Sequence, residues 1–384
     1  MFSATSDLRA NPPTRFIILL PLLFVVSGLL LRLLAIRVAA PDSVLSDYFQ
    51  TLCRWDCSWY VRLAETGYDP FPVPARVPAG NWAFFPFYPM LVGAIRWLIP
   101  LPTIALASII SIITAYAAVL VAWPLLGANR RAYTLYAAFV LSGPVSIYFT
   151  SFFTEVMYLL LVTLVFRLLA HSNYLAAGTA AALLSATRIV GVFVTISIGL
   201  QAVLDHFRTG GTWRTLVPAL LGNPRLVLAI FLAPFGLFAY MAFLHYWIGD
   251  GLAFSHVQRA WGRLIDNPLL YLWRGLNSPP TSGFVPTGSQ ILALASLAGI
   301  ALTIVLAWRR QWPAVVFCLL AIFIPLAAGL ASMLRFMAAM APLTITLMTM
   351  LAARRWLFWL SLVLLLVGAF TTTLAWLGGN VALA

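Results

Sequence analysis

The stretches RWDCSWYVRLAETGYDP, residues 54–70, and NWAFFPFYP, residues 81–89, are polar and aromatic segments in an otherwise strongly apolar chain. They follow the apolar run of residues 16–40, and half of the chain's ten carboxylates lie between Asp42 and Asp69. Placing ionisable side chains next to a bilayer costs free energy. The cluster therefore indicates a functional site, and the rest of the chain is interpreted as the membrane scaffold that holds it.

The composition is that of an integral membrane protein. Only 9% of residues are charged, 62% are hydrophobic, and the mean hydropathy is +0.97, so the chain could not cover itself with polar surface in water. The apolar runs are long rather than alternating, which favours a helical bundle over a β-barrel. We expect a single all-α domain over residues 1–384 with about eleven spans. The candidate spans are residues 16–40, 104–126, 132–150, 153–171, 173–187, 189–205, 226–248, 289–308, 313–331, 334–353 and 356–378.

The net charge of +13 comes from 23 basic residues, all of them arginine. Their short clusters at the ends of apolar runs orient a membrane protein by the positive-inside rule and do not indicate a nucleic-acid partner. If residues 84–101 lie along the membrane surface instead of crossing, nearly all of these clusters, from Arg9 to Arg355, fall on one face. The N-terminus is then cytoplasmic. Two long loops, residues 41–103 with interfacial helices and residues 249–288, face outward.

Cys53 and Cys57 flank Trp55 and Asp56. A zinc site would need further ligands nearby, and a disulfide across one helical turn is awkward in geometry. We expect two small, half-buried, unpaired cysteines.

Asp56 lies among aromatic residues, which partly desolvate a carboxylate and favour a role as proton acceptor. The alternative is that Asp56 caps the short helix that follows it. Glu155, at the outer start of a span, has the same two interpretations, because a carboxylate in a first helical turn complements the helix dipole.

Four arginines could bind a phosphate group, because the guanidinium fork matches phosphate geometry. For each of them the alternative is snorkelling or a structural ion pair. They are Arg188, Arg259, Arg263 and Arg335.

A further set of residues could form a sugar or acceptor site, with the aromatic members stacking on a sugar ring or anchoring the chain in the membrane interface. These are Trp55, Glu65, Tyr68, Phe85, Tyr88, Glu155 and Gln258.

The segments RWD (54–56), AETGY (64–68) and AFFPFYP (83–89) together resemble the first-loop signature of the PIG-V family, the mannosyltransferases of glycosylphosphatidylinositol assembly and their bacterial relatives. Three later pieces resemble family elements in the expected order. These pieces are residues 142–155, 186–191 and 249–263.

The resemblance implies a glycosyltransferase of the GT-C type in the cytoplasmic membrane of a bacterium, with an outward-facing active site. Such enzymes transfer mannose from a polyprenyl-phosphate carrier, with inversion, to a hydroxyl of a lipid or glycan acceptor. Asp56 occupies the position of the family's general base. We expect no cofactor, no required divalent metal and no obligate protein partner. The alternatives are transfer of another polyprenyl-phosphate-linked sugar, and a transporter or flippase of a lipid-linked sugar.

Overall fold

The computed structural model describes residues 14–71, 79–279 and 287–380, and the described part of the chain is helical throughout apart from turns and loops. The expectations that concern Arg9 and parts of the two long loops lie outside these residues. The α-helices are α1 (Thr14–Ala39), α2 (Tyr48–Leu52), α3 (Cys57–Thr66), α4 (Phe87–Arg96), α5 (Thr103–Ala122), α6 (Arg130–Ser142), α7 (Ile147–Thr150), α8 (Glu155–Leu169), α9 (Tyr174–Ser185), α10 (Val194–Arg208), α11 (Trp213–Leu221), α12 (Pro224–Leu232), α13 (Phe235–Ile248), α14 (Ala253–His256), α15 (Pro268–Leu276), α16 (Gly288–Trp308), α17 (Trp312–Ala327), α18 (Met333–Ala339), α19 (Ala341–Leu351) and α20 (Arg355–Leu377). Short 3₁₀ helices are η1 (Leu45–Asp47), η2 (Asn81–Ala83), η3 (Pro124–Leu126), η4 (Ile189–Phe193) and η5 (Val257–Trp261).

The chain is a multi-pass membrane protein. Within the described residues, six helical segments are long and apolar enough to cross a bilayer, and a seventh is counted if α18 and α19, bent by 74° at their junction, form one broken span. The six are α1, α5, η4 with α10, α12 with α13, α16 and α20.

Each of the eleven candidate ranges contains at least one helix. Several of these helices are too short to cross the bilayer as single spans. The helix α9 has 12 residues and α8 has 15, so they extend about 18 Å and 22 Å, against about 30 Å of hydrocarbon. The count of about eleven spans stays a prediction.

The segment 84–101 forms only the ten-residue helix α4, about 15 Å long, which is too short to cross a bilayer. Its buried face carries Tyr88, Pro89 and Val92 and packs on α3 and α5. The exposed Trp97 and Leu98 follow its end.

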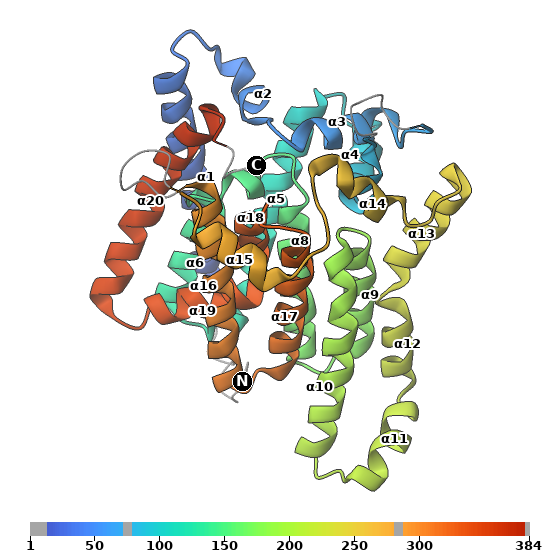
Figure 1. Ribbon diagram of the computed structural model, residues 1–384. Helices are drawn as coiled ribbons and strands as arrows, with labels where there is room; N and C mark the ends of the chain where they lie inside the picture. The colour runs from blue at the N-terminus through green and yellow to red at the C-terminus, as the bar shows by residue number, and fades with distance from the viewer. Residues whose placement is uncertain (1–13, 72–78, 280–286, 381–384) are drawn as a thin grey trace.

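The first-loop helices gather at one end of the molecule. Figure 1 shows α3, α4 and α14 at this end and α11 at the opposite one. Long-range hydrogen bonds hold the loop in place: Tyr240 Oη on α13 donates to the carbonyl of Trp82 at 2.7 Å, and Trp376 Nε1 on α20 donates to the carbonyl of Leu52 at 3.1 Å.

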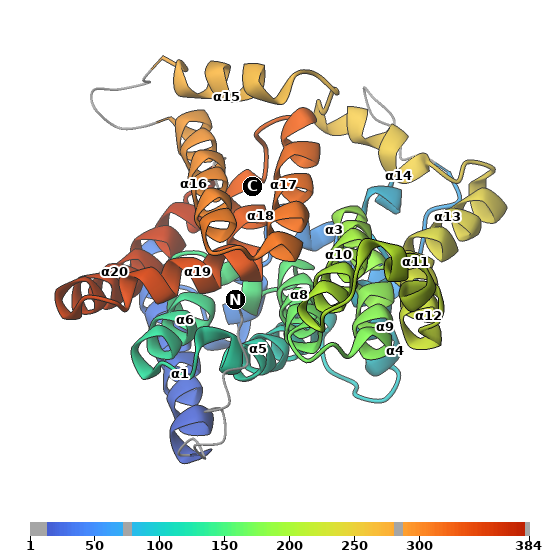
Figure 2. The same ribbon diagram turned by 90° about the horizontal axis from the view of Figure 1, so that it is seen from below.

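The helix α8 is the centre of the bundle. In the view from below, it lies between a group that contains α1, α6 and α20 and a group that contains α9 and α12 (Figure 2). Its side chains Val156, Leu159 and Val162 are fully buried. Glu155 is the first residue of this central helix, and its side chain is fully buried.

Candidate active site

The corner between α2 and α3 positions Asp56. The helix α2 ends at Leu52, Trp55 adopts a left-handed backbone with φ of 57°, and α3 begins at Cys57. Cys53 and Cys57 form a disulfide across this corner, with their Cα atoms 5.3 Å apart. The expectation of unpaired cysteines was wrong, because it placed both in one helix, whereas the helix is interrupted between them.

Asp56 sits at the N-cap position of α3, but its side chain makes no capping hydrogen bond. Its Oδ2 instead forms a short ion pair with Nη2 of Arg335, on α18. The capping interpretation of Asp56 is therefore not what the structure shows.

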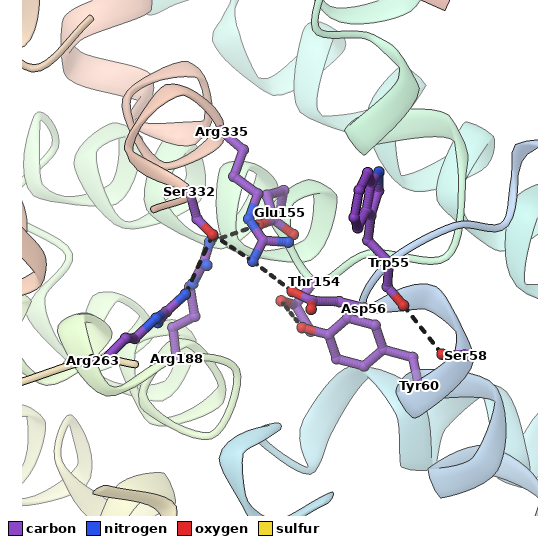
Figure 3. Close-up of polar contacts among 10 residues, drawn as sticks. All are labelled: Trp55, Asp56, Ser58, Tyr60, Thr154, Glu155, Arg188, Arg263, Ser332 and Arg335. Carbon is purple, nitrogen blue, oxygen red and sulfur yellow. Dashed lines mark hydrogen bonds and ion pairs between the residues drawn. The ribbon is translucent and has the colours of Figure 1, made fainter. Parts of the chain in front are cut away.

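Arg335 also connects Asp56 to a second carboxylate. Its Nε lies 3.3 Å from Oε1 of Glu155, and Nη1 of Arg188 lies 3.2 Å from the same oxygen. Glu155 is fully buried and Arg335 is 5% exposed. Figure 3 shows these side chains converging from different elements. Removal of either partner from such a buried pair leaves an uncompensated charge.

Ser332 links two of the arginines. Its Oγ accepts a hydrogen bond from Nη2 of Arg335 at 2.9 Å and from Nη2 of Arg263 at 3.3 Å. Ser332 has a left-handed backbone, φ 69°, immediately before α18. Arg263 lies in the segment between η5 and α15, and burial together with the nearby Arg335 lowers its pKa to about 10.

Aromatic rings surround the charges. The guanidinium of Arg188 lies 4.1 Å from the ring centre of Phe336, within cation–π distance. Tyr60 donates or accepts a hydrogen bond with Thr154 Oγ1 at 3.0 Å. Burial, followed by the charges of Glu155 and Asp56, raises the pKa of Tyr60 well above its usual value, so its hydroxyl stays protonated.

A cavity of about 220 Å³ opens beside this network. Many of the side chains that line it are polar or aromatic: Asp56, Tyr60, Phe84, Phe85, Thr154, Tyr158, Arg188, Gln258, Trp261, Arg263, Arg335 and Phe336. The lining also includes the apolar side chains Ile189, Val190, Ala321, Ile324, Pro325 and Ala328. Ile189 and Ile324, two of these apolar residues, are 39% and 40% exposed.

The structure brings together six of the residues singled out in the sequence. They are the cavity-lining residues Asp56, Phe85, Arg188, Gln258, Arg263 and Arg335. Glu155 lies behind them, in contact with two of the arginines and not on the cavity wall.

The other candidates lie apart from the cavity wall. Arg259 is exposed, Trp55 is 37% exposed, and Glu65 accepts a hydrogen bond from Thr103. Tyr68 donates to the carbonyl of Phe84, and Tyr88 is buried against Ser111.

Tyr60, Thr154, Ser332 and Phe336 were not singled out from the sequence. Ser332 could have been noticed from its position three residues before Arg335, which corresponds to one turn of a helix. Thr154 directly precedes Glu155, but nothing in the sequence pairs it with Tyr60.

Comparison with protein-family models and with curated proteins gives no match. Among solved structures, the chain is similar to the oligosaccharyltransferase of Archaeoglobus fulgidus in two crystal structures. One is tethered by a disulfide to an acceptor peptide that contains the NVT sequon, and the other is the apo form. Sequence identity is 12% and 14%, the TM-score is 0.43 for both, and 94% of this chain is covered. The chain spans about half the length of these proteins, 55% and 56%.

Proposed function

We propose that this protein is an inverting glycosyltransferase that moves mannose from a polyprenyl-phosphate carrier to a hydroxyl of a lipid or glycan acceptor on the outer face of the membrane. The proposal rests on the convergence of separate sequence segments on one cavity. The four stretches that resemble the PIG-V family, residues 54–89, 142–155, 186–191 and 249–263, contribute side chains to one cavity or to the charges directly behind it. Arg335 joins them from the last third of the chain.

Inverting transfer from a lipid carrier requires a general base, a binding site for the leaving phosphate and space for the polyprenyl chain. The acceptor hydroxyl attacks the anomeric carbon of the sugar and its proton passes to Asp56. The bond between that carbon and the phosphate oxygen breaks, and its electron pair leaves on the phosphate. A positioned base contributes about 10²- to 10⁴-fold in rate, and arginines stabilise the charge that develops on the phosphate. The apolar side chains of the lining would accommodate part of the polyprenyl chain.

The first prediction concerns Asp56 and is tested by a transfer assay. The purified protein in nanodiscs is given radiolabelled polyprenyl-phosphate mannose and a lipid extract that contains acceptors. Asp56→Asn should lower transfer by at least about 100-fold, because it keeps the shape of the side chain and removes the base. Asp42→Asn, which changes an exposed carboxylate of the same loop, is the matched control and should transfer normally.

Normal transfer by folded Asp56→Asn protein would reject Asp56 as the base. Absence of transfer by the wild type with every acceptor fraction would reject mannose transfer. Movement of the intact carrier across proteoliposome membranes would then support a flippase, and transfer from a carrier with a different sugar would support the other alternative.

A further inference from the structure

Arg263 differs from the other two arginines of the cavity in its partners. Arg188 and Arg335 both lie against Glu155, and Arg335 also pairs with Asp56. Within the described part of the chain, no carboxylate lies within ion-pair distance of Arg263, whose side chain donates to the neutral Ser332 hydroxyl. Arg263 is therefore a cation of the cavity without a carboxylate in direct contact.

The charges of the site do not cancel. Three guanidinium groups and one carboxylate line the cavity, and Glu155 behind them supplies the second carboxylate. The described site thus carries one excess positive charge. In a partly desolvated cavity an uncompensated charge is unfavourable. The lowered pKa of Arg263, caused by its burial and by the neighbouring Arg335, reflects the same imbalance.

Arg263 is positioned to bind the phosphate leaving group. Figure 3 shows Arg263 and Arg188 on one side of Ser332, and Asp56 with Tyr60 on the other. An inverting transfer places the base and the departing phosphate on opposite faces of the sugar. Apolar side chains, among them Ile189, the residue after Arg188, also line the cavity and would accommodate part of the lipid chain of a phosphate held here.

The backbone holds Arg263 at the edge of the cavity. The left-handed Gly262, φ 68°, ends η5, and the amide of Arg263 donates to the carbonyl of Gln258 at 3.3 Å. Three residues later, the amide of Asp266 donates to the carbonyl of Ala327 at the end of α17 at 2.8 Å. These two contacts fix both sides of the short segment that carries Arg263.

We propose that Arg263 binds the phosphate of the lipid-linked donor, and that the single excess charge makes the site select a phosphodiester, with one negative charge, over phosphate groups with two or more. This inference rests on the proposed function for the identity of the donor. The selectivity itself follows from the charges of the site.

The test measures binding and not transfer. Three water-dispersible probes share one farnesyl chain and differ in charge: farnesyl methyl phosphate, farnesyl phosphate and farnesyl diphosphate. Their affinities for the nanodisc-embedded protein are measured by titration at low ionic strength, at a pH where the monoester is doubly charged. The wild type should bind the methyl diester most tightly. Arg263→Gln should weaken its binding by about 10- to 100-fold, the range expected for loss of a charge-assisted hydrogen bond, and Arg263→Lys should weaken it less.

Two further variants test whether the effect depends on the net charge of the cavity or on the loss of any arginine. Arg274→Ala removes an exposed arginine of α15 that does not line the cavity and should bind like the wild type. Asp56→Asn raises the excess charge by one and should shift the preference by about tenfold toward the doubly charged monoester. Equal diester affinity of Arg263→Gln and wild type, or a wild-type preference for the diphosphate, would overturn the inference.

Failure of this inference is distinguishable from failure of the proposed function. Mannose transfer by the wild type, with an unchanged KM in Arg263→Gln, would reject Arg263 as the phosphate ligand and leave the transferase standing. Arg263-dependent binding of the diester without any sugar transfer would reject the transferase and leave the anion site standing.

Discussion

Asp56 and Glu155 show how partners decide the role of a carboxylate. Each has a side chain that could complement a helix start: Asp56 is the N-cap residue of α3, and Glu155 lies in the first turn of α8. Asp56 reaches Arg335, while remaining on the cavity wall. Glu155 is fully buried behind it and contacts both Arg188 and Arg335. In the proposed reaction, Asp56 touches the substrate and Glu155 is a positioning residue.

Glu155→Gln should lower the free energy of unfolding by about 3 kcal/mol or more, because it removes the carboxylate shared by the buried Arg335 and the partly buried Arg188. Thermal unfolding in detergent, followed by tryptophan fluorescence, measures the change. Glu65→Gln is the control. It alters an exposed carboxylate that accepts one hydrogen bond, and should cost no more than about 1.5 kcal/mol. Equal stability of Glu155→Gln and the wild type would contradict the role given to this ion pair.

At the scale of elements, the α2–α3 corner and its disulfide hold Asp56 on the cavity wall. The bridge closes a loop of only five residues, from Cys53 to Cys57, so its contribution to stability through chain entropy is about 2 kcal/mol. Its larger effect is on geometry, because displacement of a reacting group by about 1 Å can cost about 100-fold in rate.

Replacement of Cys53 and Cys57 by serine should therefore reduce transfer by about 10- to 100-fold while the protein remains folded. A reducing agent should have the same effect on the wild type. The double variant itself should be insensitive to the reductant, which controls for effects elsewhere. Full activity of the reduced wild type would show that the bridge does not position Asp56.

The helices α9, α12 and α13 pack through small residues, as membrane helices often do. A Cβ atom on Gly236 of α13 would collide with the carbonyl oxygen of Ala182 on α9, and one on Gly178 of α9 would collide with the backbone of Ala229 on α12. These close approaches hold the part of the bundle that leads into Arg188.

Gly236→Ala should destabilise the protein by about 1 to 3 kcal/mol, because the added methyl group forces two backbones apart. Gly199→Ala in α10 is a matched control. Its Cβ would meet only Ile230 at an ordinary 3.7 Å, and the helical preference of alanine should leave stability unchanged or raise it by up to about 1 kcal/mol. Unfolding midpoints of the two variants in one detergent compare them directly. A less stable Gly199→Ala than Gly236→Ala would reject this account.

At the scale of the whole molecule, the first-loop helices and α14 lie at the end opposite α11 (Figure 1). The basic residues around α11, among them Arg208, Arg214 and Arg225, predict by the positive-inside rule that this end is cytoplasmic. The cavity then faces outward.

Reporter fusions test the orientation. A fluorescent protein fused after Gly210 should fold and fluoresce, because it remains in the cytoplasm. Alkaline phosphatase fused after Asp250 should be active, because it is exported. Each reporter exchanged to the other position serves as the control and should be inactive. The reversed pattern would place the cavity on the cytoplasmic side and would reject a donor used on the outer face.

The sequence predicted much of the fold and part of the site. Apolar runs located the helices α1, α5, α16 and α20, and residues 84–101, which were expected to lie along the membrane surface, contain only the short helix α4. The cysteine bridge was missed, because sequence spacing does not reveal where a helix is interrupted. Arg259 and Arg263 looked equivalent in the sequence, but only Arg263 lines the cavity.

The sequence alone determined that this is a helical membrane protein, because helix formation and membrane partitioning depend on composition within about 20 neighbouring residues. It also predicted a functional site at the first long loop. Only the tertiary structure decided which charges meet. Asp56 and Arg335 are 279 residues apart, and Arg263 is distinguished by the lack of a carboxylate partner within the described residues. Such pairings depend on how the helices pack, and no local pattern in the chain encodes them.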